Sequence, residues 1–420
     1  MNLPEEILVE ILSRLPVKCL HRFKCVSKLF TCLICDPHFH NKHLRHAQSC
    51  SNLESKRLLA NIDFDLRVSC SLFSACYNNT NIAWRPNYAA SNDKIRKKSI
   101  SVAVLCSHVN GLFCVSFGPP LGCFDWFEIC LWNPTINELR RLPNSSSLSH
   151  EETEPHYGLG YDSANDDYVV VRLITNLNDM VPKKRSIRVE LYSLKTDSWT
   201  PIYQPFPYTM LHDLRDTYFD CHFVNGRFHW MVLCDKSNYH DFSPVIVSLD
   251  LSNYEYKDIP QPNYTKVPNT LVSWKDAIGI VVLDGRLCVC CNYIERGSFD
   301  LWTMKDYGVH QSWTMMLSIP TIDGILASLN LSSWYLVPLY LFENGDVLLK
   351  TGKIRSTGER NILVYKKDKK VFEPILLGAS NVYTETLISP HRYIGTPAAL
   401  RIVKLLMGVS RDRLIQYVSY

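Results

Sequence analysis

Residues 107–115, SHVNGLFCV, place the dipeptide Asn110-Gly111 between the runs SVAVLCSHV and LFCVSF. Asparagine followed by glycine suits a two-residue type I′ turn, because both central residues of that turn take a positive φ. The flanking runs are rich in β-branched, aromatic and other apolar residues, which favours strands. The stretch therefore predicts a β-hairpin.

Similar turn signals recur along the chain at separations of 55, 60, 59 and 60 residues. These later turns are Asn165-Asp166, Asn225-Gly226, Asp284-Gly285 and Asn344-Gly345. Each lies between strand-like runs and is followed by a further pair of runs that ends in a polar turn. Near-constant spacing of unlike sequences is typical of stacked four-stranded blades, since one blade cannot bury its faces without neighbours. The pattern predicts a kelch-like β-propeller, with a β-sandwich as the alternative.

Four tryptophans accompany the later runs of these repeats: Trp132, Trp199, Trp302 and Trp313. A large aromatic side chain in a repeated sheet most often packs against the neighbouring sheet. We therefore predict that they pack between blades and do not form a ligand cage.

The first 46 residues have a helical period instead. Apolar residues recur at helical spacing in three sets separated by Pro16 and ended by Asp36-Pro37: Ile7, Leu8, Ile11, Leu12 and Leu15; Val17, Leu20 and Phe23; and Val26, Phe30, Leu33 and Ile34. We expect three or four short helices. So small a bundle buries little surface by itself, and its apolar excess predicts a partner surface.

Residues 3–30, LPEEILVEILSRLPVKCLHRFKCVSKLF, resemble an F-box, which begins with Leu-Pro and continues with Pro-x-x-x-Leu-x-Arg and Val-Ser-Lys. The matching positions are Leu3, Pro4, Leu15, Pro16, Leu20, Arg22, Val26, Ser27 and Lys28. Phe30 stands where plant F-boxes usually carry Trp, and we expect weaker docking there but not its loss. The resemblance implies binding to a Skp1-type adaptor and, through it, to cullin. We predict that an exposed apolar ridge carries this contact, although some of its members must face the core of the F-box itself: Leu3, Pro4, Ile7, Leu8, Leu12, Leu15, Pro16, Val17 and Leu20.

Residues 58–390 resemble the F-box-associated interaction domain of plant proteins, in the S-locus-like and defence-regulator-like group. SHVNGLFCV, LWNPTINELRRLP and GLGYDSANDDYVVVRL carry the likeness. The predicted organisation is α+β and multidomain: an F-box at 1–46, a linker at 47–57, the β domain at 58–390 and a tail of unknown structure at 391–420. The resemblance implies a substrate-recognition subunit of an SCF-type E3 ubiquitin ligase, which itself performs no catalysis.

The target would contact loops, because packing constrains the strands of a repeat domain. The longest candidates are residues 117–127, 143–156 and 204–218. Within the first of them, Trp126 and Phe127 are the predicted target-binding residues, since aromatic side chains dominate the energy of protein interfaces.

Composition excludes several other partners. The 45 basic and 41 acidic side chains give a net charge of only +4, evenly mixed, which predicts neither a nucleic-acid nor a membrane partner. The start MNLPEEILVEIL has no basic run and does not resemble a secretory signal. We therefore expect the chain in the cytoplasm, the nucleus or both.

The sequence gives only weak indications of a metal, nucleotide or catalytic site. Cys32 and Cys35 precede several histidines, but all these residues lie too close together for a zinc site, and we expect both cysteines to be buried. Gly158-Leu-Gly160 lacks the third glycine of a nucleotide-binding loop and is predicted to be a turn. No catalytic motif, metal site or cofactor is predicted. The alternative function is a ligand- or glycan-binding kelch-like sensor or enzyme, with its ligand in the central channel.

Overall fold

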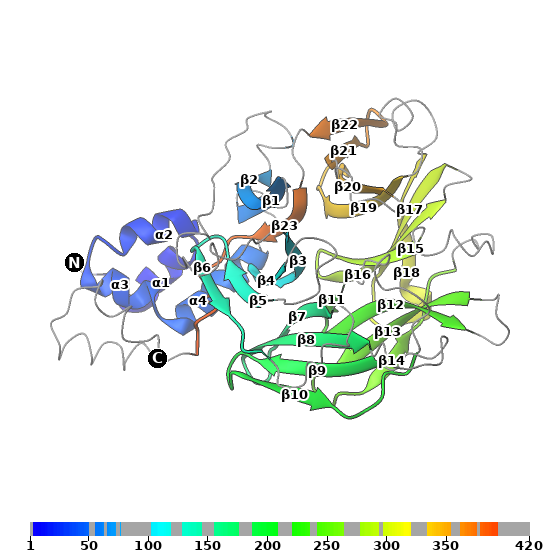
Figure 1. Cartoon of the computed structure of the whole chain (residues 1–420). Helices are drawn as coiled ribbons and strands as arrows, with labels where there is room; N and C mark the ends of the chain where they lie inside the picture. The colour runs from blue at the N-terminus through cyan, green and yellow to red at the C-terminus, as the bar shows by residue number, and fades with distance from the viewer. Residues whose placement is uncertain are drawn as a thin grey trace.

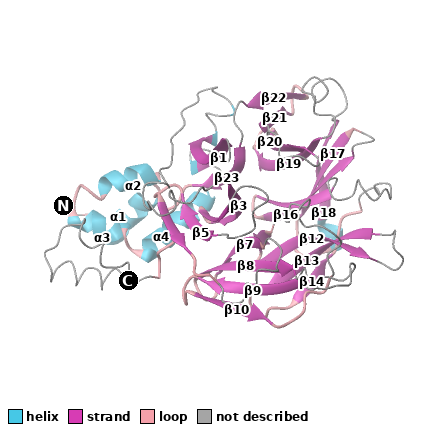
Figure 2. Ribbon diagram, viewed as in Figure 1, coloured by secondary structure: helices cyan, strands magenta, loops and turns pink. Residues whose placement is uncertain are grey.

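The computed structural model describes residues 3–49, 55–62, 65–72, 76, 102–118, 128–144, 155–175, 187–208, 221–235, 242–263, 278–293, 297–320, 334–353, 362–375 and 379–393. Within these ranges, four N-terminal helices precede a ring of antiparallel β-sheets (Figure 1). Figure 2 shows the same division, with the α-helical bundle beside a domain built of strands.

The helices are α1 (Glu5–Ser13), α2 (Val17–Phe23), α3 (Lys28–Ile34) and α4 (Pro37–Ser49). Pro4 and Pro16 precede α1 and α2 in extended conformation, where the missing N–H of proline costs no helical hydrogen bond. The Ser27 hydroxyl caps α3 by accepting a hydrogen bond from the Phe30 amide at 3.1 Å. The predicted series of short helices is confirmed, and α4 continues to residue 49.

Five sheets each contain four consecutive strands in up-and-down order. Their strands are β3 (Val102–Val109), β4 (Leu112–Gly118), β5 (Glu128–Asn133), β6 (Glu138–Arg141), β7 (His156–Asp162), β8 (Asp167–Thr175), β9 (Ile187–Ser193), β10 (Ser198–Ile202), β11 (His222–Val224), β12 (Arg227–Asp235), β13 (Phe242–Asp250), β14 (Tyr256–Ile259), β15 (Ile278–Leu283), β16 (Arg286–Tyr293), β17 (Ser298–Met304), β18 (Trp313–Pro320), β19 (Trp334–Leu341), β20 (Val347–Lys353), β21 (Ile362–Lys366) and β22 (Val371–Ile375).

A three-stranded sheet closes the ring by joining the start of the β domain to its end. Its order is β2 (Asp65–Ser71), β1 (Lys56–Ile62) and β23 (Ala379–Thr384), with Lys56 paired to Thr384. Leu58 packs with residues of the fifth four-stranded sheet, whereas Leu59 and Tyr383 pack with the first. The predicted N-terminal helices and β-propeller are therefore confirmed, and the sandwich alternative is set aside.

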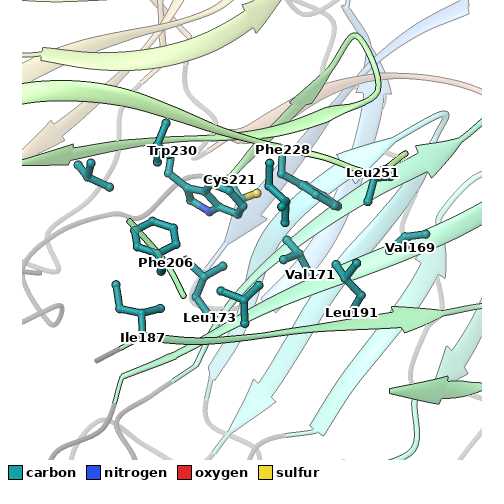
Figure 3. Close-up of a cluster of buried hydrophobic side chains, with 14 residues drawn as sticks. Val169, Val171, Leu173, Ile187, Leu191, Phe206, Cys221, Phe228, Trp230 and Leu251 are labelled. Atoms are coloured by element: carbon teal, nitrogen blue, oxygen red, sulfur yellow. The ribbon is translucent and has the colours of Figure 1, made fainter. Parts of the chain in front are cut away.

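Hydrophobic clusters fill the space between successive blades. In Figure 3, Val169 and Val171 of β8 face Phe228 and Trp230 of β12, which belong to the next sheet. All fourteen side chains of this cluster are buried. Each blade thus buries a face against its neighbour, as repeat architectures require.

The four tryptophans do pack between blades, as predicted. The Trp199 indole donates a hydrogen bond to the Pro143 carbonyl of the preceding blade at 2.7 Å, and Trp313 makes the same contact with Pro260 at 2.7 Å. Trp132 lies in the cluster between the closing sheet and the first blade. Trp302 packs against the cluster between the third and fourth blades.

Three of the five turns have the predicted type I′ conformation, with both central residues at positive φ: Asn110 (53°) and Gly111 (76°), Asn225 (52°) and Gly226 (72°), and Asp284 (48°) and Gly285 (69°). The other two predictions of turn type were wrong. In the Asn165-Asp166 turn only Asp166 has a positive φ (50°), and in the Asn344-Gly345 turn only Gly345 does (83°). Longer connections join β7 to β8 and β19 to β20 than a two-residue turn provides. Gly158-Leu-Gly160 lies inside strand β7 and is not a turn.

Candidate functional site

The helical bundle exposes large apolar side chains. On α1 and just before it, Leu3, Ile7 and Ile11 are 55%, 45% and 48% exposed, and their spacing of four residues places them on one face of the helix. Between α2 and the start of α3, Val26 and Leu29 are 64% and 46% exposed. Apolar side chains gathered on so small a module indicate a protein-binding surface.

The predicted ridge is only partly exposed. Leu3, Pro4, Ile7 and Pro16 are exposed, and Leu8 and Leu15 are half-buried. Leu12, Val17 and Leu20 are the members that face the core of the bundle, where all three are buried with Leu33, Ile34 and Phe39. The sequence reasoning missed Ile11, Val26 and Leu29 as surface residues, since their apolar character made them equally suitable for the core.

Charged side chains fix the apolar helix α1 against α4. The Glu10 carboxylate accepts a hydrogen bond from Arg14 one turn along α1 and forms an ion pair with Lys42 of α4 at 2.7 Å. Lys42 and Arg14 together lower the pKa of Glu10 to about 2. Near neutral pH this exposed ion pair is a polar contact between α1 and α4 that adds to the apolar packing of the bundle core.

The bundle rests on the short turns of the first blade and on the cluster between the first two blades. Ile136 of the β5–β6 turn packs against the bundle core, and Leu44 of α4 packs into the cluster between these blades. The Gln48 side chain of α4 donates a hydrogen bond to Asn110 in the β3–β4 turn at 2.9 Å. One end of the ring at these blades is therefore covered by helices.

The other end of the ring carries the remaining connections, because successive connections in an up-and-down sheet alternate between ends. At this end β4 ends and β5 begins. In the same way, β6 ends there and β7 begins, and β10 ends there and β11 begins. The predicted target loops 117–127, 143–156 and 204–218 join these strand ends. Trp126 and Phe127, and most of the three loops, lie outside the described residues.

The cysteines considered for zinc are placed differently from the prediction: Cys32 is exposed and Cys35 is half-buried, although both were expected in the core. In the described part of the chain no group of three His, Cys, Asp or Glu side chains could hold a metal ion. No helix among the same residues is long and apolar enough to cross a membrane.

The buried histidine of the described β domain, His229, has a structural partner. The His229 ring, fully buried in β12, shares a hydrogen bond of 2.6 Å with the Tyr307 hydroxyl of the next blade. Burial lowers the pKa of His229 to about 3, so the ring is neutral at physiological pH. It links two blades, and the geometry around it gives no sign of acid–base chemistry.

A helical module with an exposed apolar face, seated on a closed propeller, defines a class of protein-binding adaptors. The chain belongs to the F-box proteins that carry an F-box associated β-propeller domain: that family model matches residues 75–393, and the F-box domain model matches residues 1–42. An F-box joined to this propeller is the architecture of the substrate-recognition adaptors of SCF ligases.

Two relatives from Arabidopsis thaliana illustrate the similarity. The F-box/kelch-repeat protein At3g23880 is 29% identical over 354 residues, which cover 83% of this chain and 87% of the relative. The F-box protein CPR1 is 29% identical over 334 residues, which cover 76% of this chain and 73% of the relative. In both, the similarity extends over most of this chain.

Proposed function

We propose that this chain is the substrate-recognition subunit of an SCF-type E3 ubiquitin ligase. Its F-box binds a Skp1-type adaptor, and through it cullin, while the propeller binds the target protein. The observation that carries this proposal is the exposed apolar face of α1, on a bundle that matches the F-box model. The chain itself performs no bond chemistry, since holding a target lysine near the ubiquitin carrier supplies the rate.

Within the predicted ridge, the exposed and half-buried members make the adaptor contact: Leu3, Pro4, Ile7, Leu8, Leu15 and Pro16. Leu12, Val17 and Leu20 support them from the bundle core. Desolvation of a few apolar anchors provides most of the binding energy in such interfaces. Ile11, which shares the face of Ile7, is added to the contact.

Calorimetric titration of a purified Skp1-type adaptor into the full chain tests this half of the proposal. Replacing Leu3 and Pro4 together by Ala should weaken binding while leaving the melting of the β domain unchanged. Met315 and Met316, exposed on β18, offer a matched control, since their replacement by Ala also removes exposed apolar side chains. Unchanged binding in the first variant, or equal loss in the control, would contradict the assignment.

The target binds at the end of the ring away from the helices, where loops 117–127, 143–156 and 204–218 connect strands. Helices cover the opposite turns of the first blade, where Ile136 and Asn110 contact the bundle, and this supports the choice of face. Trp126 and Phe127 are the proposed anchors. The complex would act in the cytoplasm, the nucleus or both.

Proteins that co-purify with the wild-type chain provide the target for a loop test. Exchange of the three loops for short Gly-Ser turns should abolish capture of that target and preserve adaptor binding and thermal stability. Capture that survives all three exchanges would place recognition elsewhere, in the central channel, on the helical end or in the tail.

A further inference from the structure

Residues 385–393, here called the C-terminal strap, run from β23 between the ring and the helical bundle. Leu387 is 2% exposed and packs in the bundle core with Leu12, Leu20 and Ile34. The next residue, Ile388, is fully buried in the cluster between the first two blades. Adjacent strap residues thus belong to two different hydrophobic cores.

Buried hydrogen bonds hold the strap on the first blade. Asn133 donates from its side-chain amide to the carbonyls of Thr386 at 3.1 Å and Ile388 at 2.8 Å. The Thr386 hydroxyl donates to the Asn110 carbonyl at 2.9 Å. A side chain at Gly111 would approach the Thr386 hydroxyl to 2.6 Å, so this turn and the strap are in close contact. The strap has one position on the ring.

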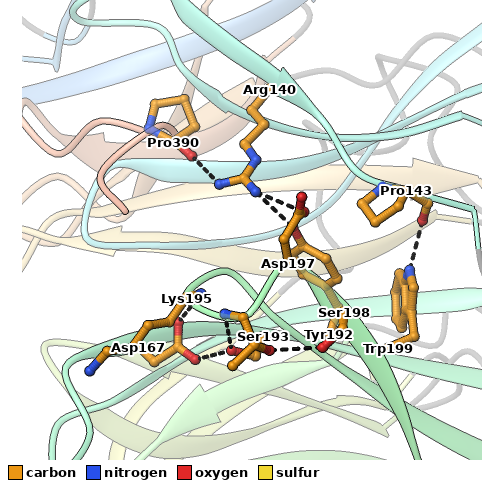
Figure 4. A network of polar contacts seen from close by, with 11 residues as sticks. Arg140, Pro143, Asp167, Tyr192, Ser193, Lys195, Asp197, Ser198, Trp199 and Pro390 are labelled. Atoms are coloured by element: carbon orange, nitrogen blue, oxygen red, sulfur yellow. Dashed lines mark hydrogen bonds and ion pairs between the residues drawn. The ribbon is translucent and has the colours of Figure 1, made fainter. Parts of the chain in front are cut away.

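Two buried arginines extend these contacts. Arg140 donates to the Pro390 carbonyl at 3.3 Å and forms an ion pair with Asp197 of the second blade at 2.7 Å, as Figure 4 shows. Arg392 donates to Asn41 of α4 at 3.0 Å and pairs with Asp166 of the β7–β8 turn at 2.9 Å. Its guanidinium therefore joins the bundle to the second blade.

The strap begins where the ring closes. Thr384, the last residue of β23, pairs with Lys56 of β1, and Glu385 follows with an ion pair to Arg57 at 3.2 Å. Only two residues, Glu385 and Thr386, separate the paired Thr384 from Leu387. The position of Leu387 in the bundle is therefore set by the pairing of β23 with β1.

We propose that closure of the β ring completes the F-box, because the strap delivers Leu387 into the bundle core only when β23 is paired. A bundle of about 45 residues is marginal without such support. The consequence for docking rests on the adaptor function proposed above. The coupling would restrict adaptor docking to chains whose target-binding domain is fully folded. Apparent adaptor affinity falls in proportion to the fraction of chains with a formed bundle.

Hydrogen–deuterium exchange of the full chain tests the coupling without the adaptor. Leu387→Ala should accelerate amide exchange in α1–α3 by about tenfold or more, since a buried Leu→Ala change removes contacts and leaves a cavity. Exchange in β11–β18 should not change. Tyr383→Ala, which weakens the closing strand, should also accelerate exchange in the helices.

Leu301→Ala provides the matched control. Leu301 is as deeply buried as Leu387 but lies in the fourth blade, so its loss should raise exchange there and leave α1–α3 protected. If Leu387→Ala does not fold, Leu387→Val gives the same comparison at smaller amplitude. Unchanged helix exchange in the Leu387 variant or in the Tyr383 variant, or equal acceleration in the control, overturns the inference. A wild-type chain that fails to bind the adaptor would instead refute the proposed function.

Discussion

Gly158→Ala tests the packing of neighbouring blades. A Cβ at Gly158 of β7 would lie 2.2 Å from the Cys221 sulfur and 2.7 Å from the Cys221 Cβ, on the segment that enters β11. Normal carbon contacts are about 3.5–4.0 Å, so the second and third blades would have to separate. Such overpacking lowers the free energy of unfolding by about 1–3 kcal/mol. We expect a loss near the upper end of this range, because the Cys221 Cβ is fixed to the backbone and cannot rotate away.

Urea unfolding followed by circular dichroism measures the effect. Gly279→Ala is the matched control in inner strand β15, because its new Cβ would meet only the Cys290 sulfur, at 3.3 Å. Its effect should stay within about 0.5 kcal/mol. Adding Cys221→Gly to Gly158→Ala removes both clashing atoms and should recover part of the loss, as a coupling energy in a double-mutant cycle. Wild-type stability in Gly158→Ala, or no coupling to Cys221, would refute the reasoning.

Trp313→Phe keeps the apolar ring but leaves the Pro260 carbonyl without its donor, and should lower the free energy of unfolding in urea by about 1–2 kcal/mol. Arg172→Ala leaves the buried Glu190 carboxylate paired only with the more exposed Arg188, at 3.4 Å, and should cost about 3 kcal/mol in the same assay; Arg172→Met with Glu190→Leu should cost less than the single change. Burial lowers the pKa of His40 from 6.5 to about 4. Between pH 6.5 and pH 4 the unfolded chain therefore binds a proton at His40 that the folded chain does not bind. The free energy of unfolding should fall as the pH drops through this range. His40→Gln should flatten that pH dependence, whereas an unchanged slope would contradict burial as its cause.

The repeat spacing predicted the propeller, yet it could not predict every turn. Asn110-Gly111 and Asn344-Gly345 present the same dipeptide, but only the first forms a type I′ turn. In the second case Leu341 pairs with Val347, which leaves a longer connection stabilised by the Asp346 carboxylate. Strand register decides the length of the connection, and register depends on neighbours that a dipeptide does not show.

Helical periodicity predicted the helices but not which of their apolar faces would be buried. Ile11 and Leu12 are adjacent and equally apolar, and only Leu12 enters the core. That core is completed by Ile136 and Leu387 of the β domain, which contact the bundle from distant parts of the sequence. Which residues of the bundle are buried thus depends on tertiary contacts with the β domain, and residues 3–46 alone do not predict it.

Binding of a Skp1-type adaptor is best measured by an equilibrium titration of the full chain with the purified adaptor. We expect one-to-one binding with a Kd of about 1 µM or tighter, as is usual for a specific interface. Replacing Ile7 and Ile11 by Asp should weaken it by at least about a hundredfold, because two apolar anchors would be charged, with helix content unchanged. Absence of binding by the wild-type chain, or full affinity in the Ile7 and Ile11 variant, would contradict the account.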